Sequence, residues 1–361
     1  MDSIGSFERF KEYILALRKT DKIAILHHTD ADGICAGIIA KKSIEKIVGA
    51  KISIHFHQPE GKITIIPDTI EYLNSKGITH LVVVDMAIDH DSAPVKELEK
   101  HVKILLIDHH VKANDINSGN IVMVKAIDLS KVSPDKYPAS KMCYDLFSQI
   151  TDIGDLRWLA SVGIYGDYAQ SKWQEFISET TKETGITEKK IKAVEGLIFY
   201  SNAIRGIDGL KEAFDIISEA KSVDNILKSR LKEYKKNVEG ELKKYLRVHK
   251  SKAEFHDSLI IYEISPKHRI KSRLINILSQ EHYPNRTIVL LQLEGDRAYI
   301  SARRQDCLLS MNDMLKAALS GIPESEGGGH VPAAGGYLPK SHISEFKRRV
   351  ISYCKEKELK G

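Results

Sequence analysis

The chain has 361 residues, of which 42% are hydrophobic and 29% are charged, and its formal net charge is +5. A chain of this length and composition is expected to fold into about two compact domains rather than to remain disordered. No apolar run approaches the roughly 18 to 20 residues that cross a bilayer, and the charged N-terminus does not resemble a secretory signal, so we expect a cytoplasmic protein without a membrane partner.

Up to about residue 110, short apolar runs alternate with helical patterns. We expect strands at 22–26, 51–56, 80–85 and 102–108, with helices between them at 37–47, 68–77 and 93–101. Strands that are apolar throughout and separated by helices are typical of a parallel sheet that is covered on both faces. The sequence therefore predicts an N-terminal α/β domain with a mainly parallel sheet flanked by helices.

Beyond residue 138 the strand pattern gives way to helical patterns, which continue through a lysine-rich segment at 223–250. We interpret its charges as a solvated helix face, with a basic track for a polymer as the alternative. Strands are expected again at 258–265, 287–293 and 298–303, followed by a glycine-rich loop and a final helix from Ile343. The predicted domains are an N-terminal domain at 1–222, a helical linker at 223–250 and a smaller C-terminal α/β domain at 251–361.

Acidic and imidazole side chains gather at the ends of apolar runs. They are His28, Asp30 and Asp32 after the first strand, Asp85 after the third, Asp108, His109 and His110 after the fourth, and Asp167 after the run SVGIYG. In a parallel sheet the carboxyl ends of the strands share one edge, where ligands bind. We therefore expect side chains that are distant in sequence to converge there.

Converging carboxylates repel one another and take up protons unless a cation neutralises them. Imidazole and carboxylate ligands together suit Mn, Zn, Fe or Co, whereas oxygen ligands alone favour Mg or Ca. The aspartates and histidines at these strand ends are more numerous than one ion needs. Two ions that share a bridging carboxylate would use all of them, and such a pair is suited to the hydrolysis of phosphate esters.

Each cluster also has a structural interpretation when it is considered alone. A single aspartate after a strand, such as Asp85, is commonly a helix cap. His27 is interpreted as a packed histidine, and His55, His57 and His80 as ordinary sheet or surface histidines. The ordered combination of HxDxDG, an aspartate at a strand end, DHH and GD favours the metal site.

In this order the motifs resemble the DHH phosphoesterase superfamily, which includes RecJ exonucleases, oligoribonucleases, cyclic-dinucleotide phosphodiesterases and family II pyrophosphatases. The resemblance implies two divalent metal ions, preferably Mn, with Mg or Co as alternatives. It also implies a role for each residue: His28 and Asp30 bind one ion, Asp85 bridges both, and Asp32, His109 and Asp167 bind the other. His110 would face the scissile phosphate, and Asp108 would orient the neighbouring histidines.

A second motif lies in the predicted C-terminal domain. The segment EGGGHVPAAGGYL resembles the GGGHxxAAG signature of the DHH-associated C-terminal domain, although a flexible turn is the alternative interpretation. Glycine lets backbone N–H groups approach a phosphate closely. The resemblance implies substrate binding by Gly328, Gly329 and His330, by Arg303 as first choice or Arg304 as second from the strand at 298–303, and by Ser301.

The GGGH motif is not that of family II pyrophosphatases, and the HxDxDG motif has the RecJ form. With no room after residue 361 for a bacterial-type OB-fold domain, the resemblance favours a stand-alone RecJ-like exonuclease of the archaeal type. We expect it to hydrolyse single-stranded DNA or RNA from an end, preferably 3′ to 5′, to 5′-mononucleotides. The alternatives are an oligoribonuclease, a cyclic or linear dinucleotide phosphodiesterase, and a replisome-associated scaffold. Expected partners are single-stranded nucleic acid or short oligonucleotides, and replication or repair proteins.

Overall fold

The computed structural model describes residues 3–59, 61–329 and 331–358, and its contacts divide the chain into two units, residues 1–235 and 236–361. Each unit has its own sheet and its own buried apolar core. The predicted fold class is confirmed, with a parallel sheet flanked by helices, a helical middle region and a smaller C-terminal unit. Within the described part of the chain, none of the helices combines the length and the apolar character that a bilayer crossing requires.

The strands of the first sheet follow the order β2-β1-β3-β4-β5, and every neighbouring pair is parallel. Their bounds are β1 (Ile23–His27), β2 (Ile54–Phe56), β3 (His80–Val84), β4 (Lys103–Asp108) and β5 (Ile121–Lys125). The first four correspond to predicted strands. The sequence does not predict β5, because its apolar run is short and ends in a lysine that only the structure shows to be buried.

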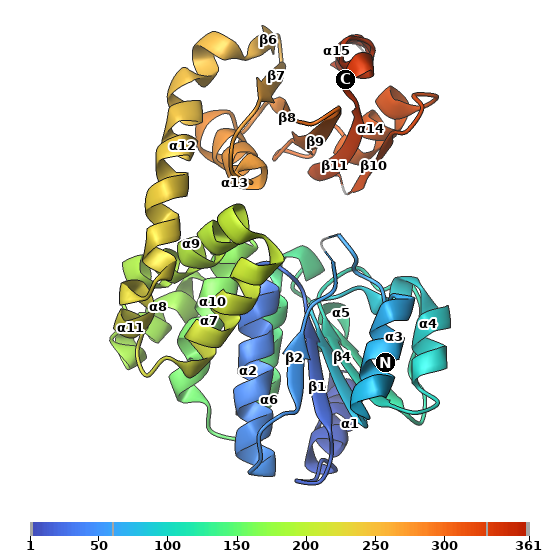
Figure 1. Cartoon of the computed structure of the whole chain (residues 1–361), viewed down its shortest axis with the longest axis vertical. Helices are drawn as coiled ribbons and strands as arrows, with labels where there is room; N and C mark the ends of the chain where they lie inside the picture. Colours follow the sequence, from blue (N-terminus) through green and yellow to red (C-terminus); the bar gives the residue numbers. More distant parts are fainter. Residues whose placement is uncertain (1–2, 60, 330, 359–361) are drawn as a thin grey trace. The chain divides into compact units, whose positions relative to one another are not determined.

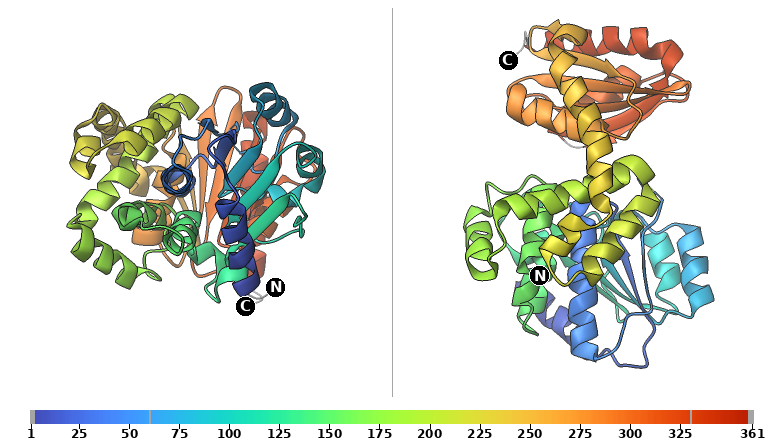
Figure 2. Two further views of the ribbon diagram at one scale, coloured as in Figure 1. Left: turned by 90° about the horizontal axis from the view of Figure 1, so that it is seen from below. Right: turned by 60° about the vertical axis from the view of Figure 1, so that its left-hand side comes forward.

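Alternate residues of the strands face two different helical layers. Ile25 and Val82 belong to the core under α1 (Ser3–Leu15), α2 (Ala31–Val48), α6 (Ala139–Ser148) and α7 (Arg157–Gly166). Leu26 and Val83 belong to the core under α3 (Pro67–Lys76) and α4 (Ser92–Leu98). Figure 1 and the right-hand view of Figure 2 show α2 and α3 on opposite sides of the sheet. Both faces are therefore covered, which leaves the strand ends as the accessible edge for a ligand.

The middle region is helical, as predicted. After the short α5 (Ala126–Leu129), it contains α6 and α7 and continues with α8 (Gln174–Thr184), α9 (Glu188–Arg205), α10 (Ile207–Glu219) and α11 (Val223–Lys228). The segment predicted as a linker, 223–250, comprises α11 and most of α12 (Leu231–Lys252). Val223 and Ile226 are buried in the core of the first unit, so the segment begins as part of that unit. The boundary between the units falls inside α12, after Lys235.

The second unit has a mixed sheet with the strand order β10-β11-β9-β8-β7-β6, in which β7 and β8 are parallel and the other neighbours antiparallel. The strands are β6 (Glu254–His256), β7 (Leu259–Ile264), β8 (Thr287–Glu294), β9 (Arg297–Arg303), β10 (Glu326–Gly329) and β11 (Ala333–Pro339). Met314 on α14 (Met311–Leu319) and Phe346 on α15 (Ile343–Glu358) are buried in its core. Helix α13 (Lys271–Ile277) packs against β8 and β9.

The prediction of a glycine-rich loop is wrong, because this segment forms the antiparallel hairpin of β10 and β11. A Cβ on Gly336 would lie 2.4 Å from the carbonyl oxygen of Glu326, and one on Gly327 would lie 2.5 Å from Leu319 Cδ1. The glycines therefore let the two strands and α14 pack closely. Strand pairing of this kind depends on a neighbouring strand, and a glycine-rich sequence carries no alternation of apolar and polar residues that would reveal it.

Candidate metal centre and nucleotide-binding residues

The residues predicted as metal ligands converge at the carboxyl edge of the first sheet, where β1, β3 and β4 end and α2 begins. Among the described residues, three groups have ligand atoms within 4.8 Å of one another. They are His28, Asp30 and Asp85; Asp32, His109 and Asp167; and Asp85, His109 and His110. The first two groups correspond to the two ligand sets that the resemblance implies, and the third places Asp85 beside His109 of the second set.

Asp30 has two contacts at the start of α2. One carboxylate oxygen accepts a hydrogen bond from the N–H of Gly33 at 2.9 Å and so caps the helix. The other oxygen lies 2.9 Å from Nδ1 of His28, and the same nitrogen lies 3.5 Å from a carboxylate oxygen of Asp85. A Cβ on Gly33 would lie 2.6 Å from the Cβ of His28, so glycine is what lets the helix begin this close to the histidine.

Asp32 and Asp167 lie on the helical side of the cluster. Asp32 is fully buried, and its oxygens accept the backbone N–H groups of Ala139 at 2.6 Å and Ser140 at 3.0 Å, at the start of α6. Asp167 directly follows α7. A Cβ on Gly163 of α7 would lie 2.3 Å from Asp32 Oδ1. Small residues and backbone donors therefore bring α2, α6 and α7 together at these two carboxylates.

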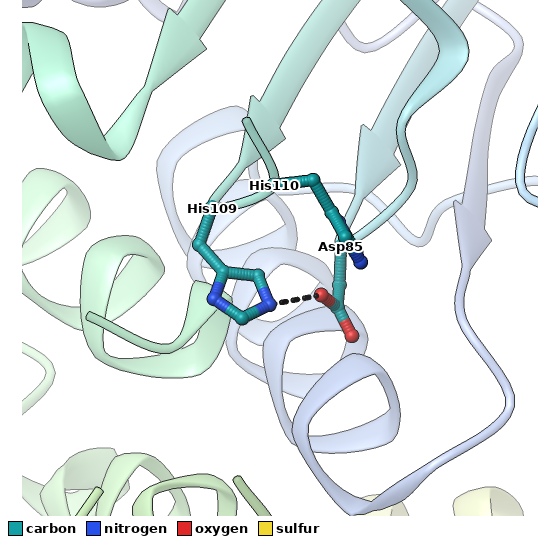
Figure 3. A group of neighbouring side chains, drawn as sticks. All are labelled: Asp85, His109 and His110. Atoms are coloured by element: carbon teal, nitrogen blue, oxygen red, sulfur yellow. Dashed lines mark ion pairs between the residues drawn. The ribbon is translucent and has the colours of Figure 1, made fainter. Parts of the chain in front are cut away.

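His109 connects the two sides of the cluster. Its Nε2 lies 3.2 Å from Asp85 Oδ1 and 3.5 Å from Asp167 Oδ2. Its Nδ1 lies 3.0 Å from the carbonyl oxygen of Pro134, which can only accept, so Nδ1 carries the proton and Nε2 faces the carboxylates. Figure 3 shows the ring of His109 directed at Asp85, with His110 as the next residue in the chain.

His110 has a different partner. Its Nδ1 lies 2.7 Å from Asp108 Oδ1, which also accepts the backbone N–H of His110 at 3.3 Å. Asp108 is fully buried, and its other oxygen lies 2.5 Å from Nζ of Lys125. Of the two histidines that Asp108 was predicted to orient, it contacts His110, whereas His109 is oriented by the carbonyl group of Pro134.

The crowding of charged groups shifts their pKa values. Burial raises the pKa of Asp32 to about 7, and the neighbouring Asp85 adds to the shift. Burial also raises the pKa of Asp167 well above its usual value. Burial lowers the pKa of His28 and of His109, but their carboxylate neighbours outweigh it, so both pKa values are raised overall. Without a cation, the cluster therefore takes up protons.

Two further observations fit divalent cations at this place. Asp85 Oδ1 and Asp167 Oδ2 are buried and, apart from their ion-pair contacts with His109 Nε2, have no hydrogen-bond partner among the described residues. Asp85 has a φ of 60°, and Tyr168, next to Asp167, has a φ of 53°, a conformation that is costly for residues other than glycine. Buried acceptors without donors and strained backbone are typical of ligand sites, and the mixed imidazole and carboxylate donors suit a divalent ion such as Mn, Zn, Fe or Co.

The histidines interpreted as structural lie outside these ligand groups. His27 is buried, its ring stacks on Phe214 with centroids 4.8 Å apart, and its Nδ1 lies 2.8 Å from the carbonyl oxygen of His28. His55 stacks on the same phenylalanine at 3.8 Å and pairs with Asp215 at 2.9 Å. Both pack against α10. Neither these two nor His57 and His80 belongs to a metal-holding group in the described part of the chain.

Ser301 and Arg303, predicted to bind substrate, lie on β9 of the second unit. Ser301 is buried. The Arg303 guanidinium donates from Nε to Asn276 Oδ1 on α13 at 3.0 Å, and from Nη1 to the carbonyl oxygen of Ala302 at 2.9 Å. These bonds set the direction of the side chain at the end of the strand.

Arg304, the second choice for the substrate arginine, is buried. Its Nε lies 2.7 Å from Asp306 Oδ1, and its Nη1 donates to the hydroxyl of Thr287 at 3.2 Å. These contacts tie β8 to the segment that follows β9. The geometry therefore favours a structural role for Arg304 and leaves Arg303 as the candidate for the substrate.

Gly328 and Gly329 end β10. The N–H of Gly329 donates to Asn312 Oδ1 on α14 at 3.1 Å. Among the atoms of the described residues, a Cβ on Gly328 would have only this Asn312 oxygen within 4 Å, at 3.8 Å, so these residues leave the backbone open there. His330, the remaining residue predicted from this motif, lies outside the described residues.

Sequence reasoning missed residues that contact the predicted ones. They are Lys125 beside Asp108, Asn276 beside Arg303, and Asn312 beside Gly329. The two asparagines are single amides on helices without a motif, so no sequence signal marks them. Lys125 follows a short apolar run that the sequence does not identify as a strand, so its position beside Asp108 shows only in the structure.

Comparison with known families agrees with this architecture. Residues 22–167 match the DHH family, N-terminal domain, and residues 260–356 match the DHHA1 domain. The fold is thus that of a DHH-family phosphoesterase with a C-terminal DHHA1 domain. Both domains that the resemblance implies are therefore present in the chain. A comparison with curated protein sequences gives no match.

Solved structures share the fold at low sequence identity. A DHH-domain protein described as a member of the s1p family of ribosomal proteins is 17% identical, with a TM-score of 0.75 over 98% of this chain and 91% of that one. RecJ from Thermus thermophilus in complex with Mn²⁺ is 16% identical, with a TM-score of 0.67 over 98% of this chain and 55% of RecJ. A pGpG-specific phosphodiesterase from Vibrio cholerae is 14% identical, with a TM-score of 0.51 over 93% and 100% of the two chains.

Proposed function

We propose that the protein is a metal-dependent phosphodiesterase that removes nucleotides from an end of single-stranded DNA or RNA and releases 5′-mononucleotides. The observation that carries this proposal is the convergence of two ligand groups at one sheet edge, with Asp85 next to both. Mn is supported by the mixed imidazole and carboxylate donors and by the Mn²⁺ and Mg²⁺ complexes of RecJ, which has the same fold. The preferred direction, 3′ to 5′, follows the family resemblance.

In this proposal the residues of the first unit would bind the ions, and one of these residues would also contact the phosphate. Asp85 would bind both ions, with the two ligand groups on either side of it. Two divalent cations, when bound, would polarise the phosphate diester and lower the pKa of a water molecule enough for attack at neutral pH. His110, whose Nδ1 is held by Asp108, would present its other ring nitrogen to an oxygen of the scissile phosphate.

The second unit would bind a phosphate of the terminal nucleotide. Arg303 would donate to it from a guanidinium whose direction is already set by Asn276, so little ordering is needed on binding. Gly328, with an open backbone, would let the phosphate approach the chain closely. Ser301 and His330 would add further contacts, as expected from the sequence.

The test incubates the full-length protein with Mn and end-labelled oligonucleotides of DNA and RNA, labelled at either end and of several lengths. We expect labelled mononucleotides from linear single strands. A duplex should resist, because its terminal nucleotide must first be unpaired at a cost of about a few kcal/mol. Rapid cutting of a circular single strand would contradict an exonuclease.

A dinucleotide phosphodiesterase is the second candidate, because the pGpG-specific enzyme shares the fold over 93% of this chain. Linear and cyclic dinucleotides in the same assay separate the two proposals. A clear preference for dinucleotides over longer strands would favour the second candidate. Binding of Mn without hydrolysis of any of these substrates would favour the scaffold alternative.

A further inference from the structure

A buried lysine lies behind the candidate metal centre. Lys125 ends β5, and its side chain is completely buried, as are those of Asp89 and Asp108. Its Nζ lies 2.7 Å from Asp89 Oδ1 and 2.5 Å from Asp108 Oδ2. Buried ion pairs are commonly no more stabilising than apolar residues of the same size, because desolvation offsets the attraction. Three charges in the core therefore point to a role in addition to packing.

The second oxygen of each carboxylate is directed at the chain after β4. Asp108 Oδ1 accepts from Nδ1 of His110 at 2.7 Å and from the N–H of the same residue at 3.3 Å. Asp89 Oδ2 accepts the backbone N–H groups of Ala113 at 2.7 Å and Asn114 at 3.4 Å. One ammonium group thus fixes both carboxylates, and through them the histidine and the segment that follows it.

We propose that Lys125 is a positioning residue of the candidate metal centre, an inference that rests on the proposed function of that site. By holding Asp108 Oδ2, the ammonium leaves Oδ1 to accept the Nδ1–H of His110. This bond fixes the tautomer and the orientation of the ring, so that Nε2 is the nitrogen available to a phosphate. Lys125 acts through Asp108 and contacts no candidate metal ligand among the described residues.

The main variant is Lys125→Met, which keeps the length of the side chain and removes its charge. Lys141→Met is the matched control. Lys141 is also buried in the first unit, its ammonium lies 2.5 Å from both carboxylate oxygens of Asp145, and it lies over the ring of Trp173. In the described part of the chain, its partners include no candidate ligand. Both variants therefore lose a buried ion pair, whereas only Lys125→Met should also lose the positioning of His110.

Three properties of the full-length protein are measured: bound Mn, kcat and KM for bis-p-nitrophenyl phosphate, and the His110 tautomer by ¹H–¹⁵N NMR in Mg²⁺. For Lys125→Met we expect Mn content and KM close to wild type, while kcat falls by about 10- to 100-fold, as is typical when a residue behind a metal site is lost. The His110 signals should change from the single Nδ1–H form to a mixture of tautomers. Lys141→Met should retain the wild-type kcat and His110 signals even where its Tm is lower.

If Lys125→Met does not fold, the double variant Lys125→Met/Asp89→Asn provides the test, because it removes one negative charge together with the positive one. A wild-type kcat with wild-type His110 signals in either folded variant would overturn the proposal. Failure of the proposed function looks different, since wild-type protein would then hydrolyse neither oligonucleotides nor the small diester. The tautomer of His110 in the variants would still decide whether Lys125 positions it.

Discussion

The two candidate sites of this protein are built in opposite ways. At the edge of the first sheet, buried oxygens of Asp85 and Asp167 have no hydrogen-bond partner among the described residues, and burial among like charges raises the pKa of Asp32 and Asp167. On β9 of the second unit, the guanidinium of Arg303 already donates to protein acceptors. The first site is incomplete without a cation, whereas the second is ordered by its own hydrogen bonds.

This difference predicts the size and the kind of effect that a substitution produces. A site made of converging charges loses its cation when a shared ligand is lost, and its remaining carboxylates are left without a counter-charge. A site ordered by its own hydrogen bonds loses one contact to the substrate at a time. Substitutions in the first unit should therefore abolish the chemistry, and substitutions in the second should weaken substrate binding while leaving the metal in place.

Asp85→Asn has the largest expected effect. Asparagine has the size of aspartate and tolerates a left-handed backbone, so the φ of 60° is retained while the charge next to both ligand groups is lost. We expect bound Mn to fall and oligonucleotide hydrolysis to drop by roughly 10³-fold or more, the scale for loss of an essential catalytic group. Metal analysis and rate measurements check this, with His57→Ala as the control. Equal rates for Asp85→Asn and wild type in Mn would contradict the two-ion arrangement.

Gly163→Ala tests whether helix packing sets the spacing of the ligands. The added Cβ would lie 2.0 Å from Ser140 Oγ and 2.3 Å from Asp32 Oδ1, so Asp32 or α7 must move. We expect a loss of about 1–3 kcal/mol in the free energy of unfolding from overpacking, and a clear decrease in bound Mn and activity.

Gly240→Ala on α12 is the control for this substitution. Within the described part of the chain, its new Cβ would have no atom within 4 Å, and alanine favours a helix over glycine by about 0.5–1 kcal/mol. Denaturant unfolding should show Gly163→Ala less stable and Gly240→Ala slightly more stable than wild type. Wild-type Mn content in Gly163→Ala would mean that the close packing of α7 against Asp32 does not set the ligand geometry.

The convergence of these side chains at one sheet edge was predictable because its signals are local. Asp30, Asp85 and His109 each follow an apolar run, and the rule that parallel strands end at one edge brings them together without further information. Strand β5 and the β10/β11 hairpin were not predictable in the same way. Lys125 can be buried only because Asp89 and Asp108 approach it from other elements, and that pairing exists only in the fold.

At the second site, too, the sequence alone could not assign the role of each residue. Arg303 and Arg304 are neighbours in one sequence motif, and nothing in that motif distinguishes them. The structure does, because Arg304 contacts Asp306 and Thr287 while Arg303 contacts Asn276 on α13. Roles that depend on which distant side chain lies opposite cannot be read from spacing along the chain.

The variants Arg303→Ala and Arg304→Ala test whether Arg303 binds substrate and Arg304 has a structural role. Arg303→Ala should retain Mn content and Tm, while oligonucleotide hydrolysis falls by roughly 10- to 100-fold, since a hydrogen bond to a charged group contributes about 1.5–3 kcal/mol. Hydrolysis of bis-p-nitrophenyl phosphate should fall less, because that substrate lacks the terminal nucleotide. Arg304→Ala should mainly lower Tm, because Asp306 and Thr287 lose a buried partner.

His330→Ala should behave like Arg303→Ala in these assays. Mn stoichiometry and both rates are measured for each variant, together with thermal unfolding. Wild-type rates of oligonucleotide cleavage in both Arg303→Ala and His330→Ala would exclude the second unit from nucleotide binding. The first unit would then carry the only one of the two candidate sites that contributes to activity, and the second unit would have a structural role.

The smallest expected effect is a dependence of stability on pH in the metal-free protein. Burial, with the neighbouring Asp85, raises the pKa of Asp32 from 3.8 to about 7. A carboxyl group with a raised pKa contributes stability that is fully present below its unfolded pKa of 3.8 and is lost as the pH rises through about 7. The contribution of Asp32 should therefore give the metal-free protein a lower Tm at about pH 8 than at about pH 6.

Mn acts in the opposite direction, because it binds the ionised carboxylates and competes with protons for them. The rise in Tm on adding saturating Mn should thus be larger at about pH 8 than at about pH 6. The difference should be roughly 2–4 °C for each kcal/mol of Mn binding free energy that is spent at about pH 6 on displacing the proton. Scanning calorimetry at both pH values measures this, and Asp85→Asn should show a smaller rise at each. A rise of equal size at both pH values would mean that metal binding displaces no proton from Asp32, and the first site would then not depend on a cation for its charge balance.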